Sequence, residues 1–83
     1  MLHRLKVEAA YAKAILDKRK TFEIRYNDRG FNAGDFVDYT IVGSPSDYDL
    51  EYDSLPTYII DYVHSGLGLQ DGWVVLSIRE YES

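Results

Sequence analysis

The fold is decided by the stretch Lys20-Thr21-Phe22-Glu23-Ile24-Arg25-Tyr26-Asn27-Asp28-Arg29-Gly30, where an alternating pattern runs directly into a polar turn. Aromatic and aliphatic side chains occupy every second position and polar side chains lie between them, which is typical of a β-strand with two unlike faces. Residues 27–30 then supply turn chemistry. We predict a strand whose apolar face joins the core and whose polar face, with Glu23 and Arg25 two residues apart, forms a site.

The rest of the chain is predicted to be mainly β. Alternating segments, and β-branched or aromatic runs bounded by turn residues, predict strands at residues 3–7, 35–42, 47–53, 55–63 and 73–79. Residues 8–17 are rich in alanine and repeat apolar side chains at four-residue spacing, so they predict the one main helix. The predicted core comprises Phe22, Ile24, Val37, Tyr39, Ile41, Ile59, Val74, Leu76 and Ile78, with Tyr11 and Ile15 packing the helix onto it.

Two loops superficially suggest ligand motifs. A calcium loop beginning at Asp47 would need glycine at its sixth position and glutamate at its twelfth, where the chain has Tyr52 and Tyr58. Its alternating acids instead predict an edge strand that repels edge-to-edge pairing. The loop at residues 66–72 carries three glycines, but no lysine follows and a strand comes next, so a phosphate cradle fails in context. A mobile rim over the site is the functional alternative for this loop.

Composition limits the function further. Eighty-three residues suffice for one small domain with a modest core. The absence of cysteine excludes disulfides and thiolate metal sites, and no residue spacing indicates a metal or a cofactor. Because no signal-peptide pattern opens the chain and no apolar run approaches the roughly 20 residues that span a bilayer, we expect a cytoplasmic protein without membrane contact. His3 has no partner at a catalytic or metal-binding spacing, so we expect an ordinary surface or rim residue.

The net charge of −5 is unevenly distributed. Residues 1–35 hold eight lysines and arginines against five acids, a net of +3, whereas residues 36–83 hold one arginine against nine acids, a net of −8. An acidic protein cannot rely on bulk attraction to a polyanion, but the cluster from Lys18 to Lys20, with Arg25 and Arg29, predicts a local positive cleft. For Lys18 and Arg19, favourable interaction with the carbonyl end of the preceding helix is an equally good explanation.

The stretch Lys20-Thr21-Phe22-Glu23-Ile24-Arg25 resembles the G-x-K-x-x-E-x-R signature of the activating signal cointegrator homology (ASCH) domain. Residues 27–35, the segment 68–78 and the opening His3-x-Leu5-Lys6 are similar to the DUF3850-type subgroup, which is bacterial and phage. The resemblance covers nearly the whole chain. One departure is Lys18, which stands where the family has the glycine that ends the first helix, so a left-handed cap there carries a steric cost.

The resemblance implies a PUA-like fold of mixed, mainly β class: a small β-barrel with one main helix beside it and a cleft at its side. It also implies a site formed by the residues that match the family and its subgroup, namely Lys20, Glu23, Arg25, Asn27, Asp28 and Arg29. ASCH domains are proposed to bind RNA, and this chemistry suits that partner, since cations meet phosphate and aromatic rings stack on bases. A plain surface ion pair of Glu23 with its neighbours is the structural alternative.

Three functional classes follow. The first is an RNA-binding module, for single-stranded or looped RNA or a nucleotide-like ligand. The second is a small hydrolase acting on a modified nucleoside or RNA, because some ASCH proteins use a lysine to activate a threonine. Glu23 occupies the position of that threonine here, and Thr21 is a poor substitute because adjacent strand residues point to opposite faces. Enzymatic activity is therefore less favoured. The third is a protein-interaction module that docks a partner through its acidic half.

Overall fold

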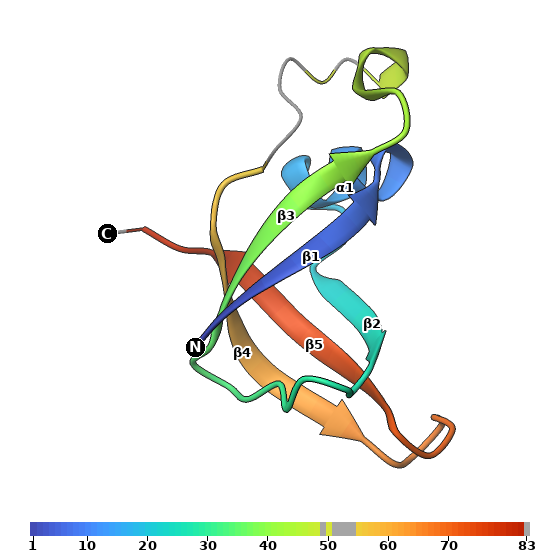
Figure 1. Cartoon of the computed structure of the whole chain (residues 1–83), viewed down its shortest axis with the longest axis vertical. Coiled ribbons are helices and arrows are strands. Elements are labelled where there is room, and N and C mark those ends of the chain that lie inside the picture. Colours follow the sequence, from blue (N-terminus) through green and yellow to red (C-terminus); the bar gives the residue numbers. More distant parts are fainter. Residues whose placement is uncertain (49, 51–54, 83) are drawn as a thin grey trace.

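The computed structural model describes residues 1–48, 50 and 55–82 of the chain. It contains five strands and one α-helix, which confirms the predicted mainly β class with one main helix (Figure 1). In chain order the elements are β1 (Leu2–Glu8), α1 (Ala9–Leu16), β2 (Phe22–Tyr26), β3 (Phe36–Val42), the 3₁₀ turn η1 (Pro45–Tyr48), β4 (Tyr58–Ser65) and β5 (Trp73–Glu80).

All five strands form one sheet in the order β1-β3-β4-β5-β2. The pair β1 and β3 is parallel, and every other neighbouring pair is antiparallel. The sheet curls into a half-barrel, with α1 lying across one end of β1 and β3 (Figure 1). Strands β1 and β2 are therefore the two edges, and the barrel stays open between them.

One core fills the concave side of the half-barrel. Seven predicted core residues are buried there, which confirms their assignment: Ile15, Val37, Tyr39, Ile41, Val74, Leu76 and Ile78. The same buried cluster includes Leu5 and Val7 of β1 and Ile60 of β4, while the predicted core residue Ile59 is only half-buried.

The predicted facing of β2 is wrong. Phe22 and Ile24 are 41% and 52% exposed, whereas Glu23 between them is only 5% exposed. The register explains this, because Glu23 lies opposite Leu76 of β5, which is completely buried. Alternation defines two faces but does not say which one is inside, and the inward carboxylate is tolerated because it is paired with cations. Tyr11, predicted to pack the helix onto the core, is also exposed.

The prediction for His3 is also wrong. Its side chain is buried, and Nε2–H donates to Asp35 Oδ2 at 2.9 Å, since an ionised carboxylate can only accept. The ring of Phe31 packs on it at 4.6 Å between centroids. Asp35 also accepts the Asn32 N–H at 3.0 Å, so this carboxylate joins the start of β1 to the loop before β3.

The predicted edge strand at residues 47–53 lies mostly outside the described residues. Its first two residues, Asp47 and Tyr48, belong to η1, and most acids of the rejected calcium loop are also outside the described part. The glycine-containing loop at residues 66–72 joins β4 to β5 through two successive turns, with the N–H groups of Leu69 and Trp73 donating to Gly66 O and Gln70 O. No helix within the described residues is long and apolar enough to cross a membrane.

Helix α1 ends in a Schellman motif at Lys18. The Lys18 N–H donates to Ile15 O at 3.0 Å, the Arg19 N–H donates to Ala14 O at 2.9 Å, and Lys18 itself has φ of 62°. This is the left-handed conformation that glycine adopts at no steric cost. Lys18 thus adopts the left-handed conformation that favours glycine, in the turn that leads from α1 to Lys20 and the start of β2.

Changing Lys18 to glycine is expected to stabilise the domain by about 0.5–1 kcal/mol. A left-handed residue with a side chain costs about 1–2 kcal/mol, and the greater freedom of glycine in the unfolded chain offsets part of the gain. Urea unfolding measures the difference, with Arg19→Gly as the neighbouring control, which should lose stability. Unchanged or lower stability of Lys18→Gly would show that the turn is not strained.

Candidate functional site

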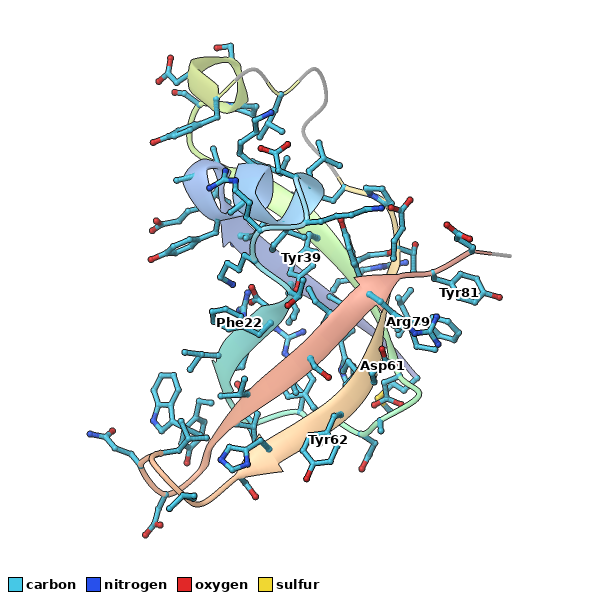
Figure 2. The ribbon with its side chains drawn as sticks, turned by 180° about the vertical axis from the view of Figure 1, so that it is seen from behind. Phe22, Tyr39, Asp61, Tyr62, Arg79 and Tyr81 are labelled. Atoms are coloured by element: carbon cyan, nitrogen blue, oxygen red, sulfur yellow. The ribbon has the colours of Figure 1, made fainter. Side chains whose placement is uncertain are left out.

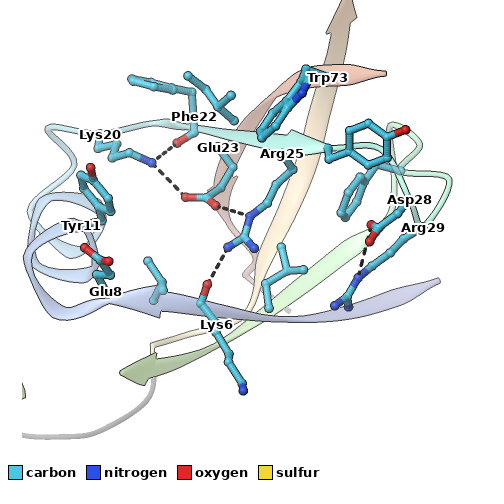
Figure 3. Close-up of a pocket in the computed structure, with 15 residues that line it drawn as sticks. Lys6, Glu8, Tyr11, Lys20, Phe22, Glu23, Arg25, Asp28, Arg29 and Trp73 are labelled. Carbon is cyan, nitrogen blue, oxygen red and sulfur yellow. Dashed lines mark hydrogen bonds and ion pairs between the residues drawn. The ribbon is translucent and has the colours of Figure 1, made fainter. Parts of the chain in front are cut away.

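A cleft of about 730 Å³ opens between the edge strands β1 and β2 (Figure 3). It is lined by Leu5, Lys6, Val7, Glu8, Tyr11, Lys20, Phe22, Glu23, Ile24, Arg25, Tyr26, Asp28, Arg29, Phe31 and Trp73. Five of the six predicted site residues are among them. The open side of the half-barrel thus coincides with the region that the sequence motif indicates.

Glu23 is the centre of the polar cluster in this cleft. One carboxylate oxygen accepts from Lys20 Nζ and the other from Arg25 Nε, both at 2.9 Å. Glu23 and Arg25 meet because side chains two residues apart on a strand share a face. Lys20 reaches Glu23 from the turn before β2, and its ammonium group also donates to Phe22 O at 2.7 Å. A carboxylate buried this deeply needs such partners, and it lies between two cations.

Two arginines bridge the open side of the half-barrel. Arg25 Nη2 donates to Lys6 O at 2.6 Å, and Arg29 Nη1 donates to Arg4 O at 2.8 Å. Strand β1 pairs on its other side with β3, so these carbonyls belong to its free edge. The guanidinium groups therefore cap acceptors that an unpaired edge would leave exposed. Since a guanidinium has five N–H donors, both arginines retain donors for a ligand in the cleft.

The polar turn after β2 places Asp28 and Arg29 in the cleft and Asn27 outside it. Asp28 lines the cleft, with Oδ1 3.9 Å from Arg29 Nε. Asn27 does not line it, because its side-chain oxygen accepts the Phe31 N–H at 2.9 Å and so holds the turn together. One concavity therefore contains five of the predicted site residues: Lys20, Glu23, Arg25, Asp28 and Arg29. Asn27 lies outside it and stabilises the turn that carries Asp28 and Arg29.

The residues that line the cleft carry a low net charge and include many aromatic side chains. Its cations are Lys6, Lys20, Arg25 and Arg29, and its acids are Glu8, Glu23 and Asp28. Five aromatic side chains accompany them: Tyr11, Phe22, Tyr26, Phe31 and Trp73. Lys20 Nζ lies 4.8 Å from the Phe22 ring centroid and 5.4 Å from that of Tyr11, distances at which a cation is attracted to a ring face. The arrangement suits a ligand that brings one or a few anionic groups and a planar ring.

The hydroxyl of Tyr39 is a buried polar group to which the sequence analysis gave no role. This hydroxyl makes no hydrogen bond to the described residues. Burial raises the pKa of Tyr39 well above its usual value, and the negative charge of Glu23 raises it further. The phenol therefore keeps its proton. Alternation alone assigned Tyr39 to the core, and only its hydroxyl could have signalled a polar role.

Two features considered from the sequence, a metal centre and the hydroxyl of Thr21, are not found in the cleft within the described residues. No group of three or more histidines, aspartates or glutamates in that part of the chain could hold a metal ion. Thr21, the one residue considered as a substitute nucleophile, lies outside the cleft and lines a smaller pocket of about 280 Å³. The cleft is therefore best described by its ion pairs and rings.

Comparison with known proteins identifies the family of this chain. A search of curated proteins found no match to the chain. The model of the family "Domain of unknown function (DUF3850)" matches residues 2–78, which include every strand that forms the cleft and the whole Lys20–Arg29 segment. With nearly the whole chain matched, this protein belongs to the DUF3850 family.

Proposed function

We propose that this domain is an ASCH-type, PUA-like module that binds single-stranded or looped RNA in the cleft between β1 and β2. The observation that carries the proposal is the gathering of Lys20, Glu23 and Arg25 in one concavity together with aromatic rings. RNA recognition favours unpaired bases that can leave the stack, meet aromatic side chains and be read by polar groups.

Each part of the cleft has a role in this proposal. The unused donors of Arg25 and Arg29, with the Lys20 ammonium, contact phosphate oxygens. Glu23 holds the Arg25 guanidinium in a fixed orientation, so less side-chain freedom is lost when a ligand binds. Aromatic rings that line the cleft, such as those of Tyr26 and Trp73, stack on a base. A small cationic area on a protein of net charge −5 limits the contact to a few phosphates.

The burial of Glu23 favours a site over a plain ion pair. Surface ion pairs join exposed side chains and contribute about 0–1 kcal/mol. Here the carboxylate is 5% exposed, and two separate cations converge on it. A fold that needed only stability would be served as well by an apolar residue at this position.

Binding is expected to be modest and to depend weakly on salt. Fluorescence anisotropy with short RNA oligonucleotides should give a log–log slope of about −1 to −3, at roughly 0.7 per neutralised phosphate on a single strand. Arg25→Ala should weaken binding by about 1–3 kcal/mol.

The matched control is Arg79→Ala. Arg79 pairs with Asp61 at 2.8 Å, away from the cleft, and its loss should leave RNA affinity nearly unchanged. Thermal unfolding of both variants shows whether they remain folded. Equal losses from the two substitutions, or no binding to any single-stranded RNA at low salt, would contradict the proposal and favour a protein partner.

A further inference from the structure

The outer side of β2 presents an apolar surface that the described fold does not cover. Phe22, Ile24 and Tyr26 are 41–55% exposed, and Trp73 is 38% exposed. Tyr26 lies directly opposite Trp73 in the β2–β5 register, so the four side chains share one side of the sheet. We call this surface the outer aromatic face. Figure 3 shows Phe22 and Trp73 on the opposite side of β2 from Glu23 and Arg25.

No described helix is packed on this face. Helix α1 contacts β1, β3 and η1, and Figure 2 shows the sheet from the side where Phe22 and Tyr62 stand free of any covering element. An antiparallel sheet with one face in water normally carries polar side chains there. A group of large apolar side chains in that position indicates a binding surface.

The rings on this face are held in place. Tyr26 and Trp73 meet edge to face, with centroids 5.9 Å apart and planes at 78°. Gly72 makes room for this pair, because a Cβ at residue 72 would lie 2.6 Å from Tyr26 Cε1, and its φ of +86° also favours glycine. Lys20 Nζ lies over the Phe22 ring at 4.8 Å. Rings fixed in this way lose little freedom when a planar partner stacks on them.

The outer aromatic face is continuous with the cleft. All four of its residues also line the cleft, so the two surfaces meet along the single edge strand β2. The face itself carries no charge, while Lys20, Arg25 and Arg29 lie along its border on the cleft side. A partner that places rings over the face and negative charges along that border matches both features, and single-stranded RNA has this chemistry.

We propose that the outer aromatic face is a second subsite, which stacks the bases of nucleotides flanking the one held in the cleft. This inference rests on the proposed function. Phe22 and the Tyr26–Trp73 pair stand four strand residues apart, about 13 Å, and so form two separate stacking positions. The preferred ligand is therefore a short single strand of several nucleotides, and a mononucleotide occupies only part of the site.

The test compares AMP with 5′-phosphorylated oligoadenylates of two and four nucleotides. Trp73 is the only tryptophan in the chain, so quenching of its fluorescence reports on this face directly. The wild-type protein should gain about tenfold in affinity for each stacked base. Tyr26→Leu and Phe22→Leu, which keep an apolar side chain but remove the ring, should abolish most of the gain in affinity with oligonucleotide length. Arg25→Ala should weaken the binding of every ligand.

Tyr62→Leu is the matched control. Tyr62 is 65% exposed, lies two strands away on β4 and does not line the cleft, so its loss should leave the gain with length intact. A length gain that persists in Tyr26→Leu and Phe22→Leu overturns the second subsite but not RNA binding. No binding of any of these ligands, or of any other single-stranded RNA, overturns both. A concentration-dependent dimer that Ile24→Ser dissociates would instead make this face an interface between copies.

Discussion

Replacing Leu76 with alanine is expected to destabilise the domain by about 2–5 kcal/mol. Leu76 is completely buried on β5, between Val63 of β4 and Glu23 of β2. Truncation removes its transfer free energy and leaves a cavity that a close-packed core fills only in part. Because domains of this size are stable by only about 5–15 kcal/mol, the loss is a large share of the total. Chemical denaturation measures it.

Ile24→Ala is the informative partner of this experiment. Ile24 has the same number of carbon atoms as Leu76 but is 52% exposed on the outer side of β2, so its truncation should cost less than about 1 kcal/mol. The comparison tests the facing of β2 directly. If the two substitutions cost the same, Ile24 is inside, Glu23 is outside and the cleft does not exist as described.

Replacing Asp35 with alanine is expected to cost about 2–4 kcal/mol. The change leaves the buried His3 ring without the acceptor for its N–H and removes the partner of the Asn32 N–H. The unsatisfied buried His3 ring costs about 1–3 kcal/mol, and the lost hydrogen bond of the exposed Asn32 adds about 0.5–1.5 kcal/mol. Asp28→Ala, in the same loop but with a carboxylate that is 66% exposed, is the control and should change stability little.

The cost of Asp35→Ala should depend on pH in the acid range. The hydrogen bond from His3 lowers the pKa of Asp35 below its usual 3.8, against the opposing effect of burial. A lowered folded-state pKa means that the ionised carboxyl stabilises the fold above the unfolded-state pKa, and that this contribution is lost as the pH falls through the folded-state pKa. The difference between wild type and variant should therefore be full at pH 7 and shrink below about pH 4. A difference that grew on acidification would contradict the pairing with His3.

Much of the fold was predictable because local pattern and tertiary structure agree. The strand segments starting near His3, Asp35 and Trp73 carry periodicities that match their burial, and the predicted helix differs from α1 by one residue at each end. The β4 segment was located less well, because Tyr58 begins the strand three residues later than predicted, and a register shift between Ile60 and Tyr62 breaks its alternation.

The candidate site was only partly predictable, for reasons of sequence distance and backbone chemistry. Lys20, Glu23 and Arg25 lie within six residues, so local geometry brings them together: Glu23 and Arg25 share one face of β2, and Lys20 reaches Glu23 from the preceding turn. The carbonyl groups of Arg4 and Lys6 leave no trace in the sequence, and they became visible as guanidinium partners only once β1 and β2 were placed as facing edges. The pairing of His3 with a residue 32 positions away was hidden for the same reason.

Nuclear magnetic resonance shows residue by residue whether RNA binds in the cleft between β1 and β2. Amide shifts of ¹⁵N-labelled protein are followed during titration with a short single-stranded RNA. If RNA binds there, the perturbed amides should cluster in β1, in residues 20–29 and at Trp73, and Arg25→Ala should suppress the changes. Perturbations confined to η1 and the first half of β4, with the Glu23 and Arg25 amides unmoved at saturation, would contradict it.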